Sequence, residues 1–201
     1  MEPRTDEQLL AAYRKGETAT FRTLIERHHE ELVRFLIRLL GDRQAAEDVF
    51  QDTFLQVHQS AGTFDTSRRF RPWLFTIAAN KGRDYLRKKN RRQEVDLNAP
   101  VSRGGGGDDG RSTTYVDLME IDIPGPSARM TEAERDLLVQ RALDALPYSL
   151  REILLLAYFQ RLSYAQIAEE LRIPLGTVKS RLHAAVAGFA TRWKDLSGQA
   201  G

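Results

Sequence analysis

The stretch that decides the fold is residues 163–189, which read SYAQIAEELRIPLGTVKSRLHAAVAGF. Tyr164, Ile167 and Leu171 recur at spacings of three and four and predict one apolar face on a short helix. Pro174 cannot continue that helix, but it is well suited to begin another. The second helix has an apolar face of its own, made of Val178, Leu182, Ala185 and Phe189. This pattern predicts a helix-turn-helix whose second helix fits a DNA major groove.

The opposite side of that second helix carries small, hydroxyl and basic side chains. Arg181 is the side chain best able to make a two-pronged contact to guanine. Thr177, Lys179 and Ser180 are better suited to phosphate contacts. The predicted duplex-DNA contacts are Ser163, Tyr164, Thr177, Lys179, Ser180, Arg181, His183 and Ala184. The alternative interpretation is a helical hairpin whose polar face only meets solvent.

Helical spacing of apolar residues covers most of the remaining chain, and no segment alternates with the period of a strand. It predicts helices at about 9–16, 21–41, 42–62 and 72–92, with Asp42 as a cap and Pro72 as a first residue. A hydroxyl residue followed three positions later by Glu or Gln predicts three more helix starts, at Thr131, Ser149 and Ser163. We therefore predict an all-α fold of two small helical domains, the C-terminal one containing the helix-turn-helix.

The predicted domains are residues 1–92 and 131–195. Between them, residues 93–130 contain four consecutive glycines, three prolines and several acids, a composition typical of a flexible linker. Within this linker, residues 115–123 are apolar enough to dock in an extended form. Residues 196–201 are expected to form a disordered tail.

The composition of the 201-residue chain narrows the class of protein. It contains no cysteine, which excludes disulfides and cysteine-ligated zinc. The N-terminus lacks a signal-peptide pattern, and the longest apolar run is seven residues, against about 18 for a membrane span. We expect a cytoplasmic protein without membrane insertion. Four scattered histidines indicate no metal site and no cofactor is expected, while His28 is predicted to lie in the core.

A basic segment lies in the first domain, because residues 68–92 contain ten Lys or Arg and one acid. Such a local patch suits a polyanionic partner. The polar face of its helix carries Thr76, Asn80, Arg83 and Arg87. The preceding loop sets aromatic residues beside cations, an arrangement that suits unpaired bases. Trp73 is expected to pack in the core, whereas core packing and base stacking are equally good interpretations for Phe64 and Phe70.

Four strings resemble the sigma factors of the extracytoplasmic-function (group IV) type. Residues 162–168 (LSYAQIA) and 176–182 (GTVKSRL) resemble region four, while residues 46–55 (AEDVFQDTFL) and 73–80 (WLFTIAAN) resemble region two. The resemblance covers about residues 9–92 and 131–193, which is the plan of a factor with these two domains only.

The resemblance implies a function for each domain. The C-terminal domain would read the minus-thirty-five element of a promoter as duplex DNA. The N-terminal domain would melt the minus-ten element through Phe64, Arg68, Arg69, Phe70, Trp73, Thr76, Asn80, Lys81, Arg83, Arg87 and Lys88. It would bind core RNA polymerase through Asp48, Gln51, Asp52, Phe54 and Leu55. An anti-sigma factor is a further implied partner.

The chain departs from the family pattern at the turn and after the recognition motif. Arg172 stands where the family commonly has Gly, which tolerates a left-handed backbone better. Ala184 and Val186 replace basic residues, so this helix is expected to make fewer phosphate contacts. The glycine-rich linker is longer than in many relatives, and a passive tether and a segment that threads the polymerase channel are equally open.

Two other functions compete with promoter recognition. A dimeric helix-turn-helix regulator would need a dimer interface, but the sequence has no coiled-coil heptad and no ligand-binding domain. An enzyme acting on nucleic acid would use Glu47, Asp48 and Asp52 as metal ligands, although these lie on two faces of one helix. Both are weaker interpretations than a non-enzymatic sigma factor.

Overall fold

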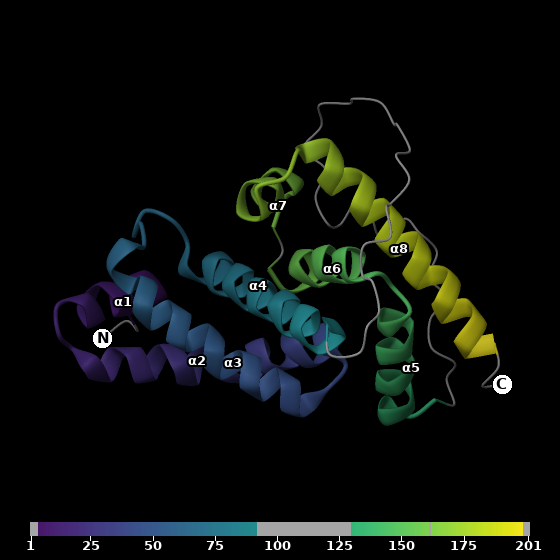
Figure 1. Cartoon of the computed structure of the whole chain (residues 1–201), viewed down its shortest axis with the longest axis horizontal. Helices are drawn as coiled ribbons and strands as arrows, with labels where there is room; N and C mark the ends of the chain where they lie inside the picture. The colour runs from purple at the N-terminus through teal and green to yellow at the C-terminus, as the bar shows by residue number, and fades with distance from the viewer. Residues whose placement is uncertain (1–3, 92–129, 161, 199–201) are drawn as a thin grey trace. The chain divides into compact units, whose positions relative to one another are not determined.

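The computed structural model describes residues 4–91, 130–160 and 162–198, and these residues form helices and turns only (Figure 1). The predicted all-α fold is therefore confirmed for this part of the chain. It divides into two compact units, residues 1–97 and 98–201. The predicted linker, except Met130, lies outside the described residues, as do the apolar segment 115–123 and residues 199–201.

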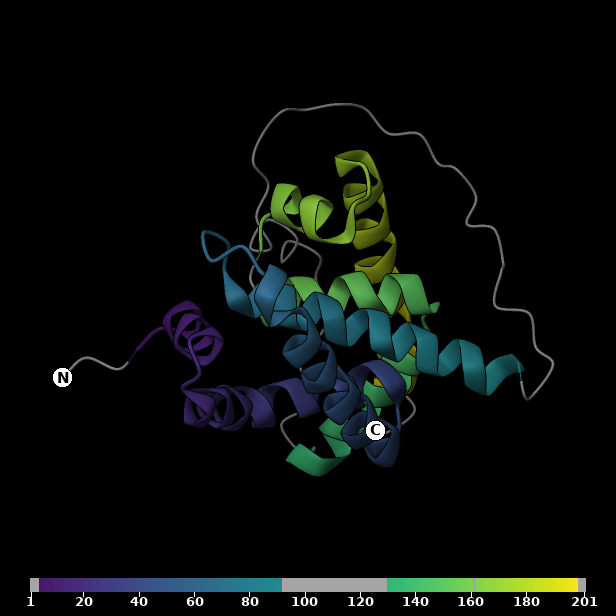
Figure 2. The same ribbon diagram turned by 60° about the vertical axis from the view of Figure 1, so that its left-hand side comes forward.

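The N-terminal unit contains α1 (Asp6–Arg14), α2 (Thr18–Leu40), α3 (Arg43–Ser60), the 3-10 helix η1 (Ala61–Thr63) and α4 (Phe70–Arg91). Helices α2, α3 and α4 pack on one another, and α1 packs mainly on α2 (Figure 2). Gly41 ends α2 in a left-handed conformation, with φ of 71°. Asp42 caps α3 as predicted, accepting a hydrogen bond from the backbone N–H of Ala45 at 3.1 Å.

The core of this unit is built from the apolar stripe of α2 and from the facing sides of α3 and α4. Its fully buried side chains include Leu24, Leu32, Phe35, Leu36, Leu39, Leu74 and Phe75. The rings of Phe35 and Phe75 meet edge to face, with centroids 5.1 Å apart. This packing buries one face of α4 and leaves the opposite face to solvent.

The C-terminal unit contains α5 (Glu132–Asp144), α6 (Tyr148–Gln160), α7 (Tyr164–Leu171) and α8 (Leu175–Gly198). Residues 196–198, predicted to belong to a disordered tail, are helical at the end of α8. Helix α8 packs on α5, α6 and α7. Thr131 and Ser163 each form the predicted capping box, with Glu134 and Gln166 respectively. None of the helices in the described part of the chain is long and apolar enough to cross a membrane.

Two predicted helix starts are wrong. Helix α6 begins at Tyr148, directly after Pro147, so Ser149 lies inside its first turn instead of capping it. Helix α4 begins two residues before Pro72, at Phe70. Proline is tolerated at that third position because the first backbone N–H groups of a helix have no intrahelical partner.

Candidate nucleic-acid and polymerase interfaces

The turn between α7 and α8 adopts a left-handed conformation at Arg172, with φ of 53° and ψ of 45°. Its backbone N–H donates to the Glu169 carbonyl at 3.2 Å, and the next N–H, of Ile173, donates to the Ala168 carbonyl at 3.1 Å. The turn therefore has the left-handed backbone conformation that favours glycine, the residue that the family commonly has at this position. Local hydrogen bonds and packing hold an arginine there at a cost of about 1 kcal/mol.

The helix-turn-helix has a continuous apolar interior. Ile167 of α7 and Val178 and Leu182 of α8 are almost fully buried, together with Ile153 and Ala157 of α6. Phe189, predicted to be buried, is only half-buried. Helix α8 also packs on α5 and α6, and these contacts fix the direction of its first turns.

The first turns of α8 present the predicted contact residues. Ser180, His183 and Ala184 are exposed, while Thr177, Lys179 and Arg181 are half-buried. Two predicted contacts at the start of α7 also have structural roles. Tyr164 is 4% exposed, and the Ser163 hydroxyl accepts the backbone N–H of Gln166 as the helix cap.

The exposed face of α4 carries the predicted polar row. Asn80, Arg87 and Lys88 are exposed, and Lys81 and Arg83 are half-buried. The Arg83 Nη1 donates to the Asn80 Oδ1 at 3.2 Å, so this amide is oriented by a neighbouring cation. The Thr76 hydroxyl donates to the Pro72 carbonyl at 2.9 Å, which ties it to its own helix.

The loop that leads into α4, residues 64–70 with Phe70 as the first residue of the helix, is ordered by Asp65. The Asp65 carboxylate accepts the backbone N–H of Ser67 at 2.9 Å, and its carbonyl accepts the N–H of Arg68 at 3.0 Å. The hydrogen bonds from the Ser67 backbone and hydroxyl, with a smaller contribution from the Arg68 charge, hold the pKa of Asp65 below its ordinary value. Arg68 and Arg69 are exposed at the tip of this loop.

The aromatic residues of the loop point inward. Phe64 is 6% exposed and Phe70 is fully buried. The Trp73 ring, half-buried, lies 4.5 Å from that of Phe64 and 5.8 Å from that of Phe70. Phe64 and Phe70 therefore pack in the core, the first of their two interpretations, because their rings fill the space between the loop and α4. We do not assign them base stacking.

The outer face of α3 carries the predicted polymerase contacts. Asp48, Gln51 and Asp52 are exposed, and Leu55 is 55% exposed. Phe54 departs from this set, since it is 5% exposed and its ring packs on Phe50, with centroids 5.0 Å apart. The face is thus acidic with one apolar side chain. Over the described residues, no group of three or more His, Cys, Asp or Glu side chains could hold a metal ion.

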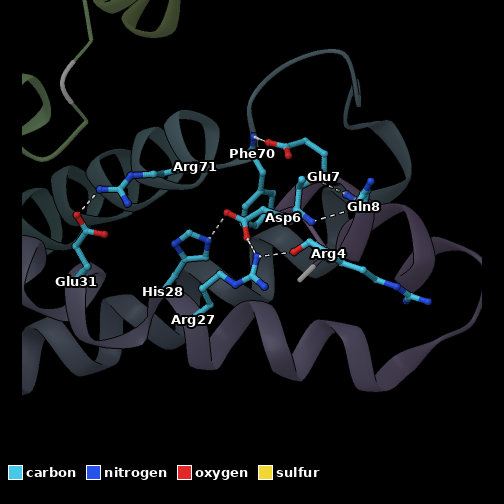
Figure 3. Close-up of polar contacts among 10 residues, drawn as sticks. Arg4, Asp6, Glu7, Gln8, Arg27, His28, Glu31, Phe70 and Arg71 are labelled. Atoms are coloured by element: carbon cyan, nitrogen blue, oxygen red, sulfur yellow. Dashed lines mark hydrogen bonds and ion pairs between the residues drawn. The ribbon is translucent and has the colours of Figure 1, made fainter. Parts of the chain in front are cut away.

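A polar cluster that the sequence did not predict joins α1 to α2 (Figure 3). The Asp6 carboxylate pairs with Arg27 Nη1 at 2.6 Å and with Nε2 of the buried His28 at 2.8 Å. Burial raises the pKa of Asp6, but the hydrogen bonds and charges of His28 and Arg27 outweigh it, so the pKa lies below its ordinary value. His28 is a core residue as predicted, and its partner is Asp6.

The chain matches two family models that follow this division into units. Residues 24–92 match the model of Sigma-70 region 2, and residues 136–187 match that of Sigma-70 region 4. Helix α1 lies outside both ranges.

Similar proteins cover almost the whole chain. It is 30% identical to the ECF RNA polymerase sigma factor SigW of Bacillus subtilis, over 91% of this chain and 94% of that protein. It is 35% identical to the ECF RNA polymerase sigma factor SigL of Mycobacterium tuberculosis, over 90% of this chain and 93% of that protein. The chain therefore belongs to the ECF sigma factors, the family of non-catalytic transcription initiation factors that the resemblance indicated.

Two solved structures share the fold. CnrH, in complex with the cytosolic domain of CnrY, has a TM-score of 0.62 and 23% identity, over 92% of this chain and 95% of that one. The sigma factor RpoE of Bartonella quintana, in complex with the anti-sigma factor NepR, has a TM-score of 0.60 and 23% identity, over 88% of this chain and 95% of that one.

Proposed function

We propose that this sigma factor divides promoter recognition between its two units. Residues 1–92 bind core RNA polymerase and melt the minus-ten element, and residues 131–195 read the minus-thirty-five element as duplex DNA. Residues 93–130 join the two as a linker. The observation that carries this proposal is the pairing of an oriented polar row on α4 with two exposed arginines on the loop before it.

Binding of single-stranded DNA would use both the polar row on α4 and the arginines of the preceding loop. The exposed Arg68, Arg69, Arg87 and Lys88 attract the phosphate backbone, and Asn80 offers an amide that can hydrogen-bond a base edge. Extruding a base costs a few kcal/mol of unstacking, and a surface whose groups are already oriented recovers that cost. Arg83 supplies the orientation for Asn80.

Upstream recognition is assigned to the first turns of α8. Arg181 is the base-reading side chain, with Thr177, Lys179 and Ser180 on phosphates. His183 and Ala184 lie exposed on the same stretch of helix. With Ala184 and Val186 in place of cations, we expect this unit to supply direction more than affinity.

Binding of core polymerase is assigned to the outer face of α3. Asp48 and Asp52 would meet basic side chains of the polymerase, and the exposed Leu55 would supply apolar contact area. Phe54 supports this face from beneath. A factor of this kind acts where the polymerase is, in the cytoplasm, and its further partner is an anti-sigma factor that covers these surfaces.

Run-off transcription with core polymerase tests the assignment. Asn80→Ala should lower promoter opening while sparing upstream protection, because Asn80 acts on the melted strand. Arg181→Ala should weaken upstream protection, because it removes the base contact. The controls are Glu30→Ala, an exposed side chain on α2, and Arg192→Ala, an exposed arginine in the later turns of α8. Wild-type activity in both test variants contradicts the site assignment, and no initiation by the wild-type chain across a promoter library contradicts the function.

A further inference from the structure

The loop of residues 64–70 is held at both ends by α1. At one end, the Arg14 Nη1 donates to the Phe64 carbonyl at 3.2 Å. At the other end, the Phe70 backbone N–H donates to the Glu7 Oε1 at 2.8 Å (Figure 3). Glu7 and Phe70 are 63 residues apart in the chain, so this contact exists only in the folded unit.

The spacing of Glu7 and Arg14 makes α1 a rigid spacer. Seven residues are two helical turns, so both side chains leave the same side of the helix, about 10 Å apart along its axis. A single helix therefore sets the separation between the two ends of the loop. Glu7 also accepts one of the first N–H groups of α4, where a negative charge is favoured by the helix dipole.

Helix α1 is in turn anchored beside this contact. Asp6 holds Arg27 and His28 on α2, and the His28 ring packs on the Phe70 ring with centroids 5.6 Å apart. Next along α4, Arg71 pairs with Glu31 of α2. Figure 3 shows these groups converging on the start of α4. Moving α1 would disrupt the contacts that fix where α4 begins.

We propose that Glu7 and Arg14 are positioning residues for recognition of the minus-ten element. They hold the loop so that Arg68 and Arg69 stand beside the polar face of α4 before DNA arrives. A loop ordered in advance loses less conformational entropy on binding, so opening is faster. This inference rests on the proposed function of the loop and extends the recognition unit to a helix outside the matched family regions.

We call the contacts of Glu7 and Arg14 with the loop the α1 clamp. Amide hydrogen exchange on the full chain, in the absence of polymerase, tests whether this clamp exists. Glu7→Ala removes the acceptor of the Phe70 N–H, and exchange at that amide should rise roughly tenfold. Glu7→Gln keeps an acceptor oxygen and should restore protection. Glu30→Ala, an exposed glutamate on α2, is the matched control and should change nothing there. Unchanged exchange at residues 65–70 in Glu7→Ala, with α2 still protected, overturns the clamp.

Promoter opening by the holoenzyme tests the consequence. Glu7→Ala and Arg14→Ala should each slow opening by about threefold to tenfold, the factor expected for the net contribution of one ordinary hydrogen bond. Upstream protection should stay as in the wild type, and Glu7→Gln should recover most of the rate, which a general loss of folding would not allow. Wild-type opening rates in both variants overturn the inference. If the wild-type chain directs no initiation, the proposed function fails, and the exchange experiment still decides whether the clamp exists.

Discussion

The two proposed DNA surfaces of this sigma factor are built in different ways. The helix-turn-helix of α7 and α8 is local, because its cap, turn and apolar contacts come from residues close together in the chain. The α4 surface depends on distant partners, since α1 fixes the loop that precedes it. From this difference we expect upstream recognition to tolerate changes elsewhere in the chain. Promoter opening should instead be sensitive to changes in α1, a helix outside the proposed DNA surface.

Removing the ring of Phe70 should produce the largest effect. Phe70→Ala leaves a cavity beside Phe64, Trp73 and His28 and should destabilise the N-terminal unit by about 3–5 kcal/mol. The loss of stability is measured by urea unfolding, with amide hydrogen exchange as the probe of each unit. The C-terminal unit should be unaffected, and the exposed Leu55→Ala should cost less than about 0.5 kcal/mol. A loss of less than 1 kcal/mol would mean that Phe70 is not a core residue.

The corresponding change in the C-terminal unit is Ile167→Ala. Ile167 is 1% exposed between α7 and α8, and its truncation should cost about 2–4 kcal/mol in that unit alone. Upstream protection should be lost while the exchange of α4 amides stays unchanged. Loss of protection in α4 would contradict the independence of the two surfaces.

Asp6→Asn should weaken the anchor of α1 in a pH-dependent way. Because the pKa of Asp6 lies below its ordinary value in the folded chain, its contribution is present above about pH 4 and is lost as pH falls through the folded pKa. The variant should lose about 1.5–2 kcal/mol at pH 7 and approach the wild type as pH falls through the folded pKa of Asp6. Denaturant unfolding of the N-terminal unit across this range is the measurement. A difference that does not depend on pH would mean that the Asp6 charge is not involved.

Arg172→Gly should have the smallest effect and the opposite sign. Glycine adopts the left-handed turn without the penalty of a side chain, so the C-terminal unit should gain about 0.5–1 kcal/mol. Arg172→Ala is the matched control, since it removes the same side chain but keeps the Cβ atom, and it should give no gain. Equal stability of the two variants would show that the turn is not strained.

The features that the sequence could predict are those that depend on residues close together in the chain. The caps at Asp42, Thr131 and Ser163, the turn at Arg172 and the buried His28 were all predictable, because each depends on local spacing. The cap at Thr5, where Gln8 completes a capping box, has the same local pattern and would have placed the start of α1.

The rest depended on tertiary structure. Core packing and base stacking were equal choices for Phe64 and Phe70, because an aromatic residue beside cations suits both. The family resemblance assigned Phe54 to a partner surface, whereas its ring is buried against Phe50. The partners of Glu7 and Arg14 lie 63 and 50 residues away, and no spacing rule reaches that far. Ser149 is not the cap because α6 already begins at Tyr148, directly after Pro147.

The proposed assignment of promoter opening to α4 and of upstream recognition to α8 can be tested most directly by transcription from two templates. One template carries the upstream element and the other lacks it. Arg181→Ala should reduce initiation on the first template and match the wild type on the second, because its partner is then absent. Asn80→Ala should show the same relative loss on both templates. An Arg181→Ala defect that persists without the upstream element, or an Asn80→Ala defect that disappears with it, would contradict the account.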